Sequence, residues 1–142
     1  MALGILLAAA TAALILWLRQ PDETHPPTAA RTISPVTPTT PDFQKLKGQW
    51  LRPDGGYIID VTNVEADGKM KVGYYNPNPI RISRAEARHE GATTIVFIEL
   101  NDAGYPGSTY TLHYDPANDQ LQGVYYQAAM QQSFEVVFVR ME

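Results

Sequence analysis

Apolar and polar residues alternate with a period of two along much of the chain after residue 42, and this period is typical of β-strands. Phe134, Val136 and Phe138 fall on one face of such a strand, and Leu121 and Tyr125 fall on one face of another. No part of this region shows convincing helical periodicity. The pattern therefore predicts a domain built mainly from strands.

The alternating segments are short, evenly spaced and separated by turn residues, which indicates a β-sandwich or a β-barrel. Because short connections join consecutive segments, we predict an all-β, eight-stranded antiparallel up-and-down meander barrel over residues 42–142. Closure of the meander would remove exposed strand edges. The predicted strands are Lys47–Arg52, Gly56–Val64, Lys69–Asn76, Ile80–His89, Thr93–Leu100, Ser108–Tyr114, Gln120–Ala128 and Ser133–Met141.

Several connections carry turn signatures. Asp67-Gly68 is typical of a type I′ hairpin turn, and Pro106-Gly107 is typical of a type II turn. Between Asn76 and Pro79 the prolines alternate with asparagines, and neither proline can donate to a strand ladder. We therefore expect a sharp break in the chain at this point.

A different pattern occupies the N-terminus, where residues 3–18 are uncharged and nearly all apolar. As a helix this segment would span roughly 24 Å, slightly less than the ~30 Å hydrocarbon core of a bilayer. Trp17 and Arg19 stand where an interfacial aromatic and a snorkelling cation belong. We predict a transmembrane signal-anchor helix over residues 1–18; a cleaved signal peptide and a buried core helix are the alternatives.

Residues 19–41 are rich in proline and threonine and offer only Ile33 and Val36 to a core. We predict a disordered, extended tether, with a recognition motif or a glycosylated stalk as the alternatives. The flanking charges mildly favour a domain that stays inside the cell, whereas the tether and the β-domain favour export. We expect a membrane-anchored protein with its domain in the periplasm or outside the cell.

Composition narrows the function classes. The formal net charge of −4 argues against a nucleic-acid partner, which would favour a basic surface. The chain has no cysteine, which excludes disulfides, thiolate metal sites, a cysteine nucleophile and acylation at a cysteine. Any attachment to a membrane would therefore depend on the N-terminal helix.

Two short motifs carry a resemblance to a known family. Gly48-Gln49-Trp50 opens the first predicted strand, and Phe138-Val139-Arg140 lies near the end of the last. Together they resemble the calycin arrangement of lipocalins, fatty-acid-binding proteins and avidins. The segment 67–74 also resembles the avidin hairpin. The resemblance implies that Trp50 packs under the barrel and that Arg140 lies across it, closing one end. Biotin binding is not implied, because Trp50 is the only tryptophan of the domain.

Tyrosines supply the candidate ligand site, because each combines apolar area with one polar tip. If they point inward, they would line a pocket for an amphipathic small molecule; the alternative is that they fill a narrow barrel. The Asn-Pro segment is either a binding rim, together with the loop at Tyr105, or pure turn geometry. The candidate ligand-binding residues are Tyr57, Tyr74, Asn76, Asn78, Tyr105, Tyr110 and Tyr125.

We identify no catalytic residues, no metal ligands and no cofactor in the sequence. His89 and His113 lack a third ligand at metal spacing, and Ser108 and Ser133 lack a neighbouring His/Asp pattern. We therefore expect a protein that is not an enzyme.

Two functions fit this description. In the first, the tethered barrel binds a small or lipid-like ligand. In the second, it is a protein-interaction or inhibitor module of the cell envelope that acts through its loops or outer wall. An open cavity of a few hundred Å³ would favour the first. A contiguous exposed apolar patch around Ile58 or residues 95–100 would favour the second.

Overall fold

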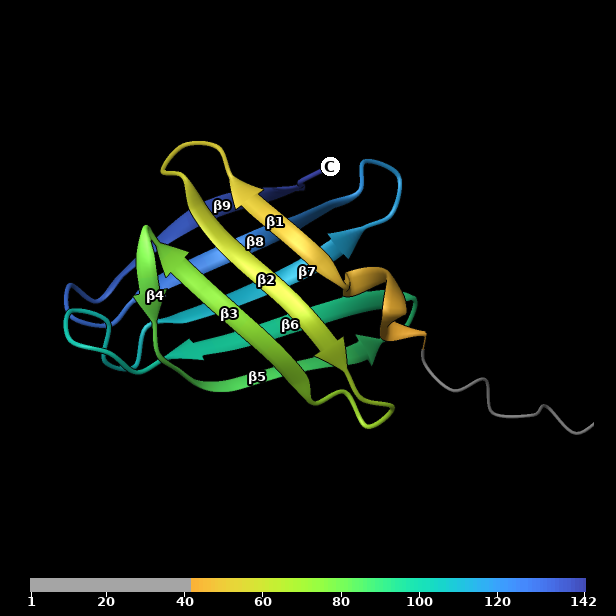
Figure 1. Cartoon of the computed structure of the whole chain (residues 1–142), viewed down its shortest axis with the longest axis horizontal. Helices are drawn as coiled ribbons and strands as arrows, with labels where there is room; N and C mark the ends of the chain where they lie inside the picture. Colours follow the sequence, from red (N-terminus) through yellow and green to blue (C-terminus); the bar gives the residue numbers. More distant parts are fainter. Residues whose placement is uncertain (1–41) are drawn as a thin grey trace, which may run out of the picture. The chain divides into compact units, whose positions relative to one another are not determined.

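The structure is a computed structural model that describes residues 42–142. These residues form one short 3₁₀-helix and nine β-strands, drawn in Figure 1. The elements are η1 (Phe43–Leu46), β1 (Gly48–Arg52), β2 (Tyr57–Val64), β3 (Met70–Asn76), β4 (Asn78–Ile80), β5 (Ile82–Glu90), β6 (Thr93–Leu100), β7 (Thr109–Asp115), β8 (Gln120–Gln127) and β9 (Gln132–Arg140).

The strands form a single antiparallel sheet in the order β4-β3-β2-β1-β9-β8-β7-β6-β5. Each strand pairs with the next one along the chain, except that β4 does not pair with β5, and the first strand, β1, pairs with the last, β9. The sheet curls on itself in Figure 1, with β1–β3 crossing in front of β6–β9. The predicted all-β, antiparallel, up-and-down barrel is therefore confirmed, and the barrel is nearly closed.

The predicted number of eight strands is wrong, because the described residues form nine. The additional strand is β4, which folds back on the end of β3 so that Pro79 lies opposite Tyr75. The sequence predicts a sharp break at the two prolines, whereas the structure places Pro79 within a strand. A proline is tolerated at the edge of a sheet, where its missing N–H costs no ladder hydrogen bond. β4 is such an edge, because among the strands of residues 42–142 it pairs with β3 alone.

The seam of the barrel lies between β3 and β5, which share no continuous ladder. An isolated bridge joins Lys69 to Glu86, and the Ala87 N–H donates to the Gly68 carbonyl over 2.7 Å. Gly68 has φ +89°, and a Cβ there would lie 2.0 Å from the Ala87 carbonyl oxygen. The predicted type I′ turn is wrong, because Gly68 has a positive φ but Asp67 does not. The turn still needs glycine at residue 68 for its backbone angle and for the close approach of β5.

Trp50 and η1 fill one end of the barrel. Trp50 is fully buried, and its indole N–H donates to the Leu46 carbonyl over 2.9 Å. Phe43 and Leu46 of η1 are also buried, so the short helix caps the interior at this end. A four-residue helix is too short to leave a periodic signal, and the sequence did not predict it.

Arg140 lies across the same end. Its guanidinium carbon is 4.0 Å from the centre of the Trp50 ring. The guanidinium donates to the Lys45 and Lys47 carbonyls over 2.6 and 2.7 Å and to both carboxylate oxygens of Asp119. These bonds tie the last strand to η1 and to the β7–β8 turn.

The part of the interior next to Trp50 is filled by side chains. Ile59, Leu121 and Phe138 are fully buried there, and Leu112 is nearly so. At the opposite end of the strands, the inward positions carry mainly tyrosines. The interior therefore has one packed end and one end of different chemistry.

The predicted membrane helix (1–18) and tether (19–41) lie outside the described residues. Within residues 42–142, no helix combines the length and the apolar character needed to cross a membrane.

Candidate ligand-binding cup

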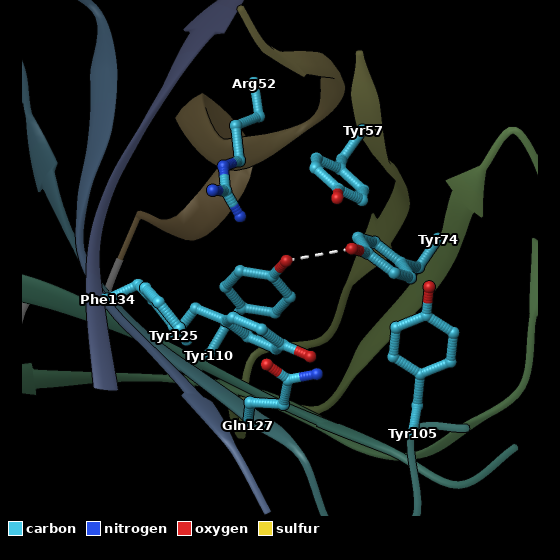
Figure 2. A pocket seen from close by; sticks show the side chains of 8 residues that line it. All are labelled: Arg52, Tyr57, Tyr74, Tyr105, Tyr110, Tyr125, Gln127 and Phe134. Carbon is cyan, nitrogen blue, oxygen red and sulfur yellow. Dashed lines mark hydrogen bonds between the residues drawn. The ribbon is translucent and has the colours of Figure 1, made fainter. Parts of the chain in front are cut away.

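A cavity of about 260 Å³ opens at the end of the barrel opposite Trp50. We call it the tyrosine cup, and Figure 2 shows its lining. Eight residues line it: Arg52, Tyr57, Tyr74, Tyr105, Tyr110, Tyr125, Gln127 and Phe134. Five of the seven candidate ligand residues thus lie around one cavity.

Strand alternation places these side chains. In β1, Trp50 points inward at the packed end, so Arg52, two residues further on, points inward at the cup. Arg52 pairs in register with Tyr57, the first residue of β2. In β8, Tyr125 and Gln127 continue the inward face that begins at Leu121. The cup is therefore the mouth-side continuation of the core faces.

Two tyrosine hydroxyls form the floor of the cup. The Tyr74 and Tyr110 oxygens are 2.8 Å apart, and both side chains are buried. The Tyr110 ring stacks on that of Tyr125 with 4.7 Å between centroids, and Phe134 stacks beyond Tyr125 at 6.3 Å. Aromatic rings thus continue from the buried floor to Phe134, which is 40% exposed at the rim.

Burial governs the ionisation of the floor. Removal from water raises the pKa of Tyr74, because the neutral phenol is favoured in a low-dielectric setting. The same desolvation raises the pKa of Tyr110 to about 12, against the opposing effects of the Tyr74 hydrogen bond and the Arg52 charge. At neutral pH both groups are therefore phenols that can donate and accept hydrogen bonds.

Arg52 brings a positive charge into the cup. Its side chain is only 14% exposed, and it forms a bidentate pair with Asp54 over 2.6 and 2.8 Å. Its guanidinium carbon lies 4.8 Å from the centre of the Tyr57 ring. The Asp54 carboxylate raises the pKa of Arg52, so the charge persists throughout the accessible pH range.

The two predicted rim loops meet at the mouth. The Asn76 side-chain amide donates to the Tyr105 hydroxyl over 2.5 Å, which joins the β3–β4 turn to the β6–β7 loop. Asn78 is exposed and is not part of the cup lining. Asn76 therefore contacts a residue of the cup lining, Tyr105, without lining the cup itself. Asn78 lies away from the cup.

Sequence reasoning missed three lining residues: Arg52, Gln127 and Phe134. The signal for each was present, because Arg52 follows Trp50, Gln127 follows Tyr125 and Phe134 precedes Val136, each by two positions. Charged and amide side chains at strand ends are usually solvated, so alternation alone does not predict that Arg52 and Gln127 point into a cavity.

The histidines and serines considered above lie elsewhere. His89 stacks on Phe43 with 4.9 Å between ring centroids, near the packed end. Ser108 is buried and accepts a hydrogen bond from the Ala128 N–H. Residues 42–142 contain no group of three or more His, Cys, Asp or Glu side chains placed to hold a metal ion.

Comparison of the chain with protein-family models, with curated proteins and with solved structures found no match.

Proposed function

We propose that the β-domain is a non-catalytic binding protein that receives a small molecule in the tyrosine cup. One observation carries the proposal: the interior is packed at the Trp50 end but leaves about 260 Å³ open at the other, lined by five tyrosines, Arg52 and Gln127. Ligand sites combine apolar walls with a few convergent polar groups, and the cup has both.

The size of the cup limits the ligand. Pockets for drug-sized molecules usually measure ~300–1,000 Å³, and the cup is slightly smaller at about 260 Å³. The packed layer around Trp50 and Phe138 leaves no depth for a long acyl chain. A compact molecule therefore fits better than a lipid.

The calycin resemblance and the cellular setting belong to the same proposal. The stacking of Arg140 on Trp50 at the closed end of a nearly closed meander supports the resemblance. The apolar segment 1–18 and the Pro/Thr-rich segment 19–41 support a membrane tether with the domain in the periplasm or outside the cell. In this setting, the barrel would capture its ligand outside the cytoplasm.

Native mass spectrometry of the full-length chain, purified from its own host, tests the proposal. We expect a co-purifying small molecule on the wild-type chain. Gln127→Phe should remove it, because the new ring would occupy the cup. Gln122→Phe is the matched control: it makes the same change in β8, but on the opposite face of the strand. A ligand-free wild-type chain would count against the proposal, and so would a ligand equally retained by both variants.

The alternative, a protein-interaction module, has a specific observation in its favour. The outer wall of β8 and β9 exposes Val124, Tyr126 and Val137, each at about 40%. This patch is not at Ile58 or residues 95–100, where the sequence directed attention. A protein partner that co-purifies with the wild-type chain but not with Val124→Ser/Val137→Ser would favour this alternative.

A further inference from the structure

The polar lining of the tyrosine cup has a marked excess of hydrogen-bond donors. Its eight residues include one arginine and no aspartate or glutamate. The Tyr57 hydroxyl and the Gln127 side-chain amide form no hydrogen bond with another residue among those described. The Tyr105 hydroxyl already accepts from Asn76, so its own proton remains free to donate. A ligand for this cup should therefore carry acceptors.

Arg52 can serve such an acceptor while keeping its partner. Asp54 binds the edge of the guanidinium that carries Nε and Nη2. A guanidinium has five donors in a planar fork, so the edge with Nη1, which lies next to the Tyr110 hydroxyl, can also take a ligand acceptor. Figure 2 shows the guanidinium directed inward, toward the Tyr110 and Tyr74 hydroxyls. Asp54 is 61% exposed, which leaves the inner edge the better shielded of the two.

The walls around this edge are flat. In Figure 2, the rings of Tyr57, Tyr74 and Tyr105 lie on one side of the cup, and those of Tyr110 and Tyr125 lie on the other. Tyr57 and Tyr74 are almost parallel, with 3° between their planes. Aromatic faces of this kind favour a planar guest through stacked or edge-to-face contacts.

We propose that the ligand is a small aromatic carboxylate, with its carboxylate at the inner edge of Arg52 and its ring against the cup tyrosines, above the floor formed by Tyr74 and Tyr110. This inference rests on the proposed function and specifies the chemistry of the ligand. The carboxylate would accept from Arg52 and from a cup hydroxyl. Charge-assisted bonds of this kind are stronger than neutral ones, and an arginine fork fits the planar carboxylate.

NMR titration of the full-length chain with four probes of similar size tests the chemistry. Benzoate is the expected ligand, benzamide removes the charge, benzylamine reverses it and cyclohexanecarboxylate removes the planarity. We expect benzoate to bind at least tenfold more tightly than each of the other three. Equal binding of benzamide or benzylamine would overturn the carboxylate. Equal binding of cyclohexanecarboxylate would overturn the aromatic ring.

Variants then locate the interaction. Arg52→Gln should weaken benzoate binding by about 10- to 100-fold, the range expected for loss of a hydrogen bond to a charged group, and should leave benzamide binding unchanged. Arg84→Gln is the matched control, because Arg84 also pairs with a carboxylate, that of Glu86, and lies over an aromatic ring, that of Phe97. Arg52→Lys keeps the positive charge and should retain part of the affinity for benzoate. This variant shows whether a loss in Arg52→Gln comes from the missing charge and not from misfolding.

The proposed function and this inference fail in different ways. If Gln127→Phe abolishes probe binding but Arg52→Gln does not change it, the cup binds ligands and the carboxylate assignment is wrong. If a molecule co-purifies in the cup but no probe binds after that molecule has been removed, the aromatic carboxylate is again wrong and the proposed function stands. If no probe binds and no molecule co-purifies, both fail.

Discussion

At the scale of single residues, the contact between the Tyr74 and Tyr110 hydroxyls is the most deeply buried side-chain hydrogen bond of the cup. Removing one hydroxyl would leave the other without this partner in a desolvated place, whereas removing both leaves no orphaned group. The free energy of unfolding should therefore respond to the two changes in a non-additive way.

We expect Tyr74→Phe and Tyr110→Phe each to lower the free energy of unfolding by about 1–3 kcal/mol, the usual cost of an unsatisfied buried group. The double variant should lose clearly less than the sum. Tyr126→Phe, on the outer wall, is the control and should be neutral. Denaturant midpoints of the wild-type chain and of the four variants measure these losses. Strict additivity would show that the two hydroxyls do not interact.

The same pair makes stability sensitive to alkaline pH. The unfolded chain ionises its tyrosines near pH 10, whereas burial holds the pKa of Tyr110 at about 12 and raises that of Tyr74. Between these values the unfolded state binds fewer protons than the folded state, so stability falls as pH rises. Below about pH 10 both states keep these protons, and the pair adds no pH dependence.

We expect a loss of about 1.4 kcal/mol per pH unit for each buried tyrosine over pH 10 to 12. Urea unfolding at a series of pH values measures the slope. The Tyr74→Phe/Tyr110→Phe double variant should show a flatter profile. A profile as steep as that of the wild-type chain would mean that other groups cause the alkaline loss.

At the scale of elements, the seam between β3 and β5 is the least paired part of the barrel. The Asp67-Gly68 turn holds the two sides of this seam together, because the Gly68 carbonyl accepts a hydrogen bond from the Ala87 N–H. A side chain at residue 68 would meet the β5 backbone and would force the two strands apart.

We expect Gly68→Ala to destabilise the domain well beyond the ~1–2 kcal/mol cost of a left-handed alanine and to speed hydrogen exchange at the Ala87 amide. Gly91→Ala is the matched control, because Gly91 has φ +61° but a Cβ added there would meet no atom within 4 Å. Gly91→Ala should lower the free energy of unfolding only by the cost of placing an alanine in the left-handed backbone conformation. Equal losses in the two variants would show that the seam does not depend on this approach.

The packed end depends on η1, β1 and β9, which meet at Trp50. We expect Trp50→Ala to lower the free energy of unfolding by about 3–5 kcal/mol, through the cavity it leaves and the loss of its contacts with Leu46 and Arg140. Chemical denaturation measures the loss. A midpoint within error of the wild-type value would show that Trp50 does not stabilise the closed end of the barrel.

The sequence patterns of the individual strands and turns explain which parts of the fold could be predicted from the sequence and which could not. Period-two alternation and the Asp67-Gly68 turn were enough for the order of the main strands, because both act locally. β4 was missed because a proline such as Pro79 indicates the end of a strand, unless the strand is known to lie at the edge of a sheet. η1 was missed because a four-residue helix leaves no periodic signal and because Arg140, which donates to its Lys45 carbonyl, is distant in sequence.

At the scale of the whole molecule, the barrel has two ends of different character, and both follow from the inward faces of the strands. Large apolar residues fill the end near Trp50, and tyrosines leave space at the other. The tyrosine content of the cup could be predicted from alternation. Its volume could not, because volume depends on how far the rings tilt against one another. Arg52 was missed because a charged residue next to a turn normally points to water.

The most direct test of ligand binding in the cup is NMR of the full-length chain with labelled tyrosine rings, before and after addition of a small-molecule extract of its host. The eight tyrosines form an internal control. If the cup is the binding site, Tyr57, Tyr74, Tyr105, Tyr110 and Tyr125 shift, while Tyr75, Tyr114 and Tyr126 do not. Absence of any shift, or shifts confined to Tyr75 and Tyr126, would contradict ligand binding in the cup.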